Sequence, residues 1–178
     1  MATRFELVLH GEDEAALRAT LRDLREEEVE AIAVCLLFSF LAPEHERRAR
    51  EIIAEELPGC DVSLSSDIVP QIREYYRLST TVINAYLSPI LAHYIANLDG
   101  RLAGAGVVTR QKYIMQSNGG VMAASTAVSR PVMMMESGPV GGIIAGAEVG
   151  KALGYKDVVS FDMGGTTAKA SLVRDGEP

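Results

Sequence analysis

Glycine recurs at every fourth position along one stretch of the chain, and this spacing strongly constrains the fold. The repeated glycines are Gly138, Gly142, Gly146, Gly150 and Gly154. Ser137 is a candidate helix cap and Pro139 suits a first helical turn, so the pattern predicts a helix that ends near the last glycine. Each interior glycine costs about 0.8–1 kcal/mol relative to alanine in a helix. Because a spacing of four aligns them on one ridge, we expect this helix backbone to lie close against a sheet or a ligand.

The next segment predicts a β-hairpin. Apolar strands are predicted at residues 157–161 and 168–173, on either side of the segment DMGGTT at residues 162–167. A glycine pair between two strands indicates a hairpin, because glycine reaches positive φ without a Cβ clash. Phosphate oxygens would be held at its tip by backbone N–H groups and hydroxyls of Gly164, Gly165, Thr166 and Thr167. Asp162, at the end of the first strand, is well placed to hold Mg²⁺ directly or through water.

An ordinary tight hairpin with an acidic residue at its mouth is the alternative interpretation. The glycine-bearing helix leads directly into the hairpin, so we expect it to pack beneath the two strands. Its N-terminus would then lie near the ligand, where the backbone of Ser137 and Gly138 favours anions. Residues 146–152 superficially resemble a P-loop, but the glycine spacing is one residue too short and no Ser or Thr follows the lysine.

A polar loop follows another predicted strand, residues 111–116. It consists of Ser117-Asn118-Gly119-Gly120, and Asn-Gly-Gly is a typical turn sequence. A plain loop is one interpretation. The other is a ligand-binding loop, because α/β proteins place ligands where strands end. On the second interpretation Ser117 and Asn118 are candidate substrate-binding residues.

The first part of the chain alternates between helical and strand patterns, which indicates a small α/β layer domain. Asp13 is a candidate cap for a helix with Leu17, Leu21 and Leu24 on one face. A continuous apolar run predicts a buried strand. The expected elements are a strand at 5–9, a helix at 14–27, a buried strand at 31–38, a helix from Pro43 to Leu57 and a strand at 61–64.

A long helix is predicted over residues 70–103, with Pro89 kinking or splitting it. Its apolar residues fall near one stripe, comprising Leu78, Val82, Tyr86, Ile90, Tyr94, Leu98 and Leu102. We expect this helix to connect the first domain to the C-terminal part of the chain. A polar and aromatic group near its start is either a solvated helix end or the edge of a cleft that grips a small anion or a neighbouring subunit; it contains Arg73, Tyr75, Tyr76 and Arg77.

The bulk properties exclude several classes of function. The chain has 178 residues, 48% of them hydrophobic, and a net charge of −7 without a basic cluster. This balance is typical of a globular protein and argues against nucleic acid or an anionic membrane surface as a partner. Cys35 and Cys60 lie in unlike settings, which indicates free thiols and a reducing compartment. No signal peptide or membrane-spanning run is found, so we expect a cytoplasmic protein.

Four segments together resemble a known family. FDMGGTT resembles a phosphate-binding hairpin of the actin-like ATPase superfamily, and the other three resemble motifs of the hydantoinase A/5-oxoprolinase family. The segments are REYYRLSTTVINAY at 73–86, MQSNGGV at 115–121, SGPVGG at 137–142 and FDMGGTT at 161–167. Each is moderately specific alone, whereas their order and combination are strongly specific. The resemblance runs from about Glu14 to Pro178.

The resemblance implies an α/β fold in three parts. Residues 1–69 would be the end of an N-terminal α/β domain, and residues 70–106 the connecting helix region. Residues 107–178 would start an actin-like (ribonuclease H-like) ATPase domain that carries the phosphate hairpin. Family members are several times longer, so we expect the chain to be an internal piece of a larger enzyme.

The implied activity is ATP-dependent opening of a cyclic amide, of the hydantoinase, N-methylhydantoinase or 5-oxoprolinase type. ATP and Mg²⁺ are the implied cofactors, and a hydantoinase B-type subunit is the implied partner. Asp162 would be the catalytic and metal-side carboxylate. Two alternatives stay open: a subunit of an ATP-dependent acetone or acetophenone carboxylase, and a non-catalytic module that keeps the fold.

Lys169 departs from the family pattern. Many relatives carry an acidic residue at this position, after Gly-Gly-Thr-Ser-Thr, whereas this chain has Gly-Gly-Thr-Thr-Ala-Lys. A lysine here would either pair with phosphate or face solvent from the strand. The substitution puts a residue-by-residue transfer of the family mechanism in doubt.

Overall fold

The computed structural model describes residues 13–109 and 111–178 and divides the chain into two compact units. One unit contains Met1–Val108 and Val128–Val132, and the other contains Thr109–Ala127 and Met133–Pro178. The strand expected at residues 5–9 lies outside the described residues. The long helix belongs to the first unit. The three-part division drawn from the family resemblance stays a prediction.

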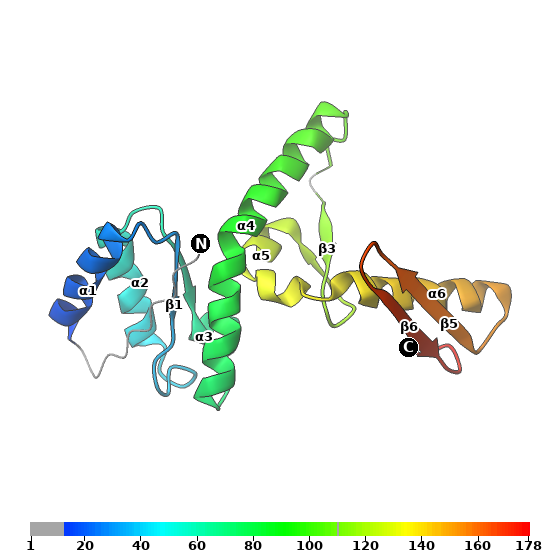
Figure 1. Ribbon diagram of the computed structural model, residues 1–178, viewed down its shortest axis with the longest axis horizontal. Coiled ribbons are helices and arrows are strands. Elements are labelled where there is room, and N and C mark those ends of the chain that lie inside the picture. Colours follow the sequence, from blue (N-terminus) through cyan, green and yellow to red (C-terminus); the bar gives the residue numbers. More distant parts are fainter. Residues whose placement is uncertain (1–12, 110) are drawn as a thin grey trace. The chain divides into compact units, whose positions relative to one another are not determined.

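The helices and strands follow the expected alternation (Figure 1). The first unit begins with α1 (Glu14–Glu26), β1 (Ala31–Val34), α2 (Glu44–Glu56), β2 (Asp61–Leu64), α3 (Ser65–Ile68) and α4 (Glu74–Gly104). Then come β3 (Tyr113–Met115), β4 (Val121–Ala123), α5 (Ala124–Ser129), the 3₁₀ helix η1 (Pro131–Met134), α6 (Ser137–Leu153), β5 (Val158–Met163) and β6 (Ala168–Val173).

A two-stranded parallel sheet forms the centre of the first unit, with β1 beside β2. On one face, Ile32, Val34 and Val62 pack against the core between α1 and α2. The other face carries small side chains such as Ser63, which accepts a hydrogen bond from Asn84 on α4 at 3.0 Å. The unit therefore has a helix–sheet–helix layering, which confirms the α/β prediction for this part of the chain.

Local signals in α1 are confirmed. Ala16 donates its backbone N–H to the Asp13 carboxylate at 2.9 Å, so Asp13 caps the helix as expected. Leu17, Leu21 and Leu24 are buried against α2. Arg48 holds the Glu14 carboxylate with two N–H groups, and this pairing lowers the pKa of Glu14.

The strand predicted over residues 31–38 is wrong beyond Val34, and the exposed side chains of Leu37 and Phe38 contradict the expected buried run. The reason is a polar contact that replaces the strand ladder. The Leu36 N–H donates to the Glu46 carboxylate at 2.9 Å, and the Leu36 carbonyl accepts from Arg77 at 2.5 Å. Phe38 then turns the chain with a positive φ of 57°.

Glu46 and Arg77 are both fully buried, although neither touches the other's charge directly. The Glu46 carboxylate also accepts from the Ser65 hydroxyl at 2.6 Å and the Ser66 N–H at 2.8 Å. Arg77 donates to the Gln71 carbonyl at 3.1 Å and lies over the Phe40 ring. Two opposite charges therefore stabilise the segment after β1 through its backbone.

The buried face of α4 is polar, which contradicts the expected apolar stripe. Its buried residues are Arg77, Thr81, Asn84, Ala85, Ser88 and Ile95. From the predicted stripe, Tyr86, Ile90 and Tyr94 are exposed. Asn84 explains the difference, because its amide bonds Ser63 and the Ser129 carbonyl and its oxygen accepts from Val132 N–H. The helix continues through Pro89 and changes direction near its middle (Figure 1).

The glycine ridge of α6 is confirmed at two positions. A Cβ on Gly150 would lie 2.5 Å from the Val158 side chain, and one on Gly146 would lie 3.1 Å from Ser160. A Cβ on Gly142 would meet nothing within 4 Å, yet the Gly142 carbonyl accepts a hydrogen bond from the Ser160 hydroxyl at 3.1 Å. Gly154 ends the helix with φ of 80°, as expected for a C-cap. The helix backbone thus lies directly on β5.

No helix within residues 13–109 and 111–178 is long and apolar enough to cross a membrane. Cys35 and Cys60 are both free, as expected.

We predict that Glu46→Gln lowers the free energy of unfolding by about 1–3 kcal/mol. The new amide NH₂ cannot accept from the Leu36 or Ser66 N–H groups, so a buried donor loses its partner. Chemical denaturation measures the change. Glu44→Gln, an exposed position on the same helix, is the matched control, and equal midpoints for both variants would contradict the prediction.

We also predict opposite effects for two glycines of α6. Gly150→Ala should destabilise the protein by roughly 1–3 kcal/mol, because its Cβ would overlap Val158. Gly142→Ala should stabilise it by up to about 1 kcal/mol, because the site is open and alanine favours helix. Thermal unfolding of both variants checks this, and a stabilised Gly150→Ala variant would show that close packing is absent.

Candidate functional site

The predicted hairpin is present in the second unit. β5 and β6 pair antiparallel from Val158↔Val173 to Met163↔Ala168, and residues 164–167 form the connecting loop. Gly164 N–H donates to the Thr167 carbonyl at 2.9 Å and closes the loop.

The conformational reason expected for the glycine pair is wrong. Neither Gly164 nor Gly165 has a positive φ, because a four-residue loop does not need the left-handed turn of a two-residue hairpin. A Cβ on Gly165 would meet nothing within 4 Å, and one on Gly164 would reach only the Thr167 carbonyl at 3.9 Å. The glycines leave the backbone of the tip bare.

The polar groups of the hairpin are exposed. Asp162 lies one residue before the end of β5, directly opposite Lys169 on β6. Within the described part of the chain, the Asp162 carboxylate and the Thr166 and Thr167 hydroxyls have no hydrogen-bond or ion-pair partner. These oxygens are therefore free to contact a ligand.

The packing of α6 on β5 directs Asp162 toward the start of the helix. Val158 packs against Gly150. Ser160 packs against Gly146 and donates a hydrogen bond to the Gly142 carbonyl, so the strand and the helix run in opposite directions. Two strand residues span about 6.6–6.8 Å and four helix residues about 6 Å, so the two repeats nearly match. Asp162 lies on the same face of β5 as Val158 and Ser160. The series therefore continues past Gly142 toward the first turn of α6.

Lys169 connects the hairpin to this helix start. Its ammonium group forms an ion pair with the Glu136 carboxylate. Glu136, with φ of 61°, is the N-cap residue of α6, and no side chain caps the helix. The prediction that Ser137 caps this helix is therefore wrong, since Ser137 is its first helical residue.

The loop of Ser117 and Asn118 is fastened to the segment that leads into α6. Ser117 N–H donates to the Met133 carbonyl at 2.7 Å, and the Ser117 hydroxyl lies in hydrogen-bond contact with the carbonyls of Met133 and Met135. Asn118 accepts from Gly120 N–H at 2.9 Å, which is a local turn contact. These bonds position the loop, and the substrate role expected for its two polar residues stays a prediction.

The structure thus gathers several predicted site residues around one end of α6. Ser137 and Gly138 form its first turn, Ser117 fastens the segment before it, and Lys169 reaches its N-cap residue. Sequence reasoning did not single out Glu136. Its signal was available, because an acidic residue directly before a helix complements the helix dipole.

Among the predicted site residues, Asp162 supplies the one carboxylate suited to a metal ion. The described residues contain no group of three or more His, Cys, Asp or Glu side chains that could hold a metal ion. Mg²⁺ is commonly held by one or two carboxylates together with substrate phosphates, so Asp162 with a bound polyphosphate is a suitable donor set.

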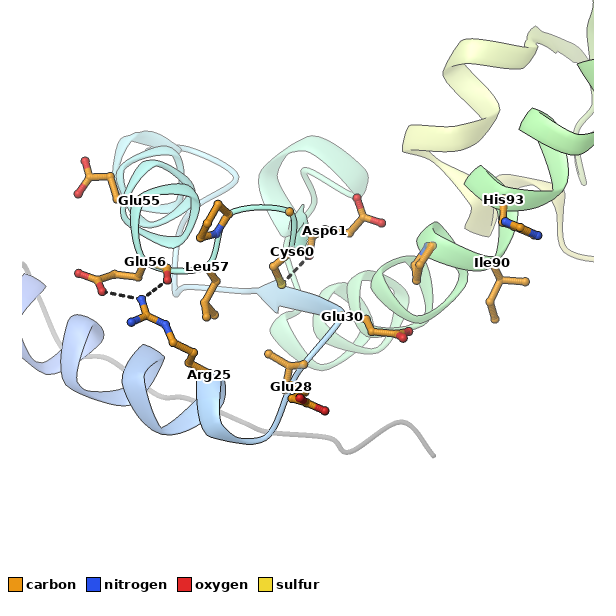
Figure 2. A pocket seen from close by; sticks show the side chains of 14 residues that line it. Arg25, Glu28, Glu30, Glu55, Glu56, Leu57, Cys60, Asp61, Ile90 and His93 are labelled. Carbon is orange, nitrogen blue, oxygen red and sulfur yellow. Dashed lines mark hydrogen bonds and ion pairs between the residues drawn. The ribbon is translucent and has the colours of Figure 1, made fainter.

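A separate open pocket of about 1180 Å³ lies in the first unit, at the amino ends of β1 and β2 (Figure 2). Its wall carries several carboxylates, and Arg25 extends across to bond Glu56. Burial, helped by the neighbouring Asp61 carboxylate, raises the pKa of the Cys60 thiol to about 11, so it is protonated at neutral pH. None of the predicted site residues lines this pocket.

Sequence comparison identifies two matching family profiles. The profile described as Hydantoinase/oxoprolinase matches residues 77–178, and the one described as its N-terminal region matches residues 3–57. The chain is 38% identical over 164 residues to the caprolactamase subunit alpha of Pseudomonas jessenii, covering 92% of this chain and 23% of that protein. It is 32% identical to the 5-oxoprolinase of Saccharomyces cerevisiae, and the alignment covers 95% of this chain and 13% of that protein.

Two solved structures share the fold. A nucleotide-free acetone carboxylase aligns with a TM-score of 0.81 and 30% identity, covering 93% of this chain and 23% of that one. The ATP-dependent caprolactamase of Pseudomonas jessenii aligns with a TM-score of 0.74 and 36% identity, and the alignment covers 94% of this chain and 25% of that one. The chain spans about a quarter or less of the length of these relatives. It belongs to the hydantoinase/oxoprolinase family.

Proposed function

We propose that this chain supplies the phosphate-binding hairpin of an ATP-dependent enzyme subunit that opens a cyclic amide. The single observation that carries the proposal is the exposed, unpaired Asp162 beside a bare Gly-Gly-Thr-Thr tip. Support comes from relatives of two kinds, an ATP-dependent caprolactamase and a 5-oxoprolinase. The proposal includes the hydantoinase and N-methylhydantoinase types of cyclic-amide opening.

The residues of the hairpin would have distinct roles. Gly165 would offer its backbone N–H to phosphate oxygens, and Thr166 and Thr167 would add hydroxyls. Gly164, whose own N–H closes the loop on the Thr167 carbonyl, would leave room for the phosphates because it has no side chain. Asp162 would hold Mg²⁺ jointly with the phosphates of ATP. Bound Mg²⁺ supplies charge neutralisation as phosphoryl transfer proceeds.

Ser137 and Gly138 would contribute N–H groups at the first turn of α6, and Ser117 and Asn118 would border the substrate. Transfer of the terminal phosphoryl group of ATP to the amide oxygen would release ADP and make the amide carbon more electrophilic. One water would then add to that carbon and the ring C–N bond would break, which leaves an acyl phosphate and a free amine. A second water would hydrolyse the acyl phosphate to a carboxylate and phosphate.

This proposal includes the larger architecture expected from the resemblance. Residues 107–178 would begin an actin-like ATPase domain, after an N-terminal domain and a connecting helix region. The complete subunit would work with a hydantoinase B-type partner in the cytoplasm. Relatives named as subunits, such as the caprolactamase subunit alpha and the acetone carboxylase beta subunit, support the partner.

A ketone carboxylase subunit is the second candidate, and the acetone carboxylase alignment favours it specifically. Both candidates use the same ATP site, so the hairpin does not discriminate between them. ATP turnover by the complete enzyme does discriminate, with hydantoin, 5-oxoproline or caprolactam compared against acetone plus bicarbonate. Turnover stimulated only by the ketone would replace the amide proposal.

We predict that Asp162→Asn lowers kcat of the complete enzyme at least about 100-fold with little change in stability. The carboxylate is exposed and unpaired, so folding does not depend on it. Asp157→Asn, just before the start of β5, is the matched control. Normal turnover by Asp162→Asn would remove this carboxylate from the site.

We predict that the 178 residues by themselves bind Mg-ATP weakly. One hairpin supplies phosphate contacts, and actin-like sites close around nucleotide with a second hairpin and an adenosine-binding segment. Titration calorimetry measures the affinity. A sub-micromolar Kd for this chain alone would refute the idea that the site needs further protein.

A further inference from the structure

Lys169 occupies a position that the proposed site would use. It lies directly opposite Asp162 in the antiparallel register, so both side chains lie on the face of the hairpin that packs toward α6. The ammonium group contacts the Glu136 carboxylate at the start of that helix. The cation therefore lies among groups on which the phosphate proposal depends.

The Lys169–Glu136 ion pair is easy to break. The Lys169 side chain is 43% exposed and the Glu136 side chain 69% exposed. Exposed ion pairs contribute about 0–1 kcal/mol, and lysine carries its charge on a flexible four-carbon stem. A polyphosphate has several negative charges and competes well with one solvated carboxylate for the same ammonium group.

Other charges on the neighbouring elements do not replace Lys169. The remaining described cations of α6, β5, β6 and their short connections lie at the far end of the hairpin: Lys151, Lys156 and Arg174. Glu148 pairs with Lys151 there, and Asp157 accepts from Asp175 N–H. At the Asp162 end, Lys169 faces only Asp162 and Glu136 among the described ionisable groups of these elements.

We propose that Lys169 is a phosphate-binding residue and that Glu136 holds it in the nucleotide-free protein. Arrival of ATP transfers the ammonium group from the Glu136 carboxylate to a phosphate oxygen, with no covalent change. Glu136 thereby weakens nucleotide binding and raises its selectivity for highly charged phosphates. This inference rests on the proposed function, because it needs ATP at the hairpin.

The test is the Kd of Mg-ATP for the complete enzyme, measured by calorimetry on matched variants. Glu136→Gln should bind about 3–10-fold more tightly, because Lys169 is released from its ion pair and is free to contact phosphate. Lys169→Met should bind at least about 5-fold more weakly, whereas Lys169→Arg should retain most of the affinity. In the Lys169→Met background, Glu136→Gln should change Kd by less than about twofold. Glu148→Gln, on the same helix, is the control.

A purely structural ion pair gives a different pattern. Glu136→Gln and Lys169→Met would then both weaken binding and both lower the melting temperature, which would overturn the proposal. Unchanged affinity in Lys169→Met would overturn it too. Asp162→Asn distinguishes failure of this inference from failure of the proposed function: if Asp162→Asn weakens binding of Mg-ATP while Lys169→Met leaves the Kd unchanged, only this inference fails. If the wild-type enzyme does not bind Mg-ATP, the proposed function fails as well.

Discussion

The close contact between α6 and β5 determines the geometry of the second unit. Gly150 and Gly146 remove the side chains that would otherwise separate helix from strand, and Val158 and Ser160 occupy the space. The three interior glycines of the ridge, Gly142, Gly146 and Gly150, lower the helix propensity by about 2.4–3 kcal/mol in total, so packing must offset this cost. The result is a fixed register in which the acidic end of β5 extends toward the N-terminus of α6. A wider helix–strand spacing would shift Asp162 and Lys169 away from Glu136.

A different kind of constraint holds the first unit together. Buried Glu46 and buried Arg77 both use the backbone of Leu36, one through its N–H and the other through its carbonyl. Burying single charges is expensive unless hydrogen bonds satisfy them, and here backbone groups supply most of these bonds. The segment after β1 is therefore shaped by polar contacts, which explains why Leu37 and Phe38 face outward despite their apolar character.

Features with a local cause were predictable from the sequence. The Asp13 cap, the buried leucines of α1, the glycine ridge and the hairpin each depend on residues a few positions apart. The early end of β1 was not predictable, because it depends on Arg77, 41 residues away. Asn84 similarly turns a polar face of α4 inward through distant partners. At the candidate site, the hairpin was predictable from its glycine pair and flanking apolar runs, whereas the Glu136–Lys169 contact joins residues 33 positions apart and required the fold.

In the proposed mechanism, the tip of the β5–β6 hairpin and the first turn of α6 together receive the phosphates of ATP. Hydrogen exchange on the complete enzyme, with and without Mg-ATP, tests this joint role most directly. Slower exchange at the amides of residues 165–167 and of Ser137 and Gly138 is the predicted result. Protection elsewhere in the enzyme, with unchanged exchange at these amides, would contradict it.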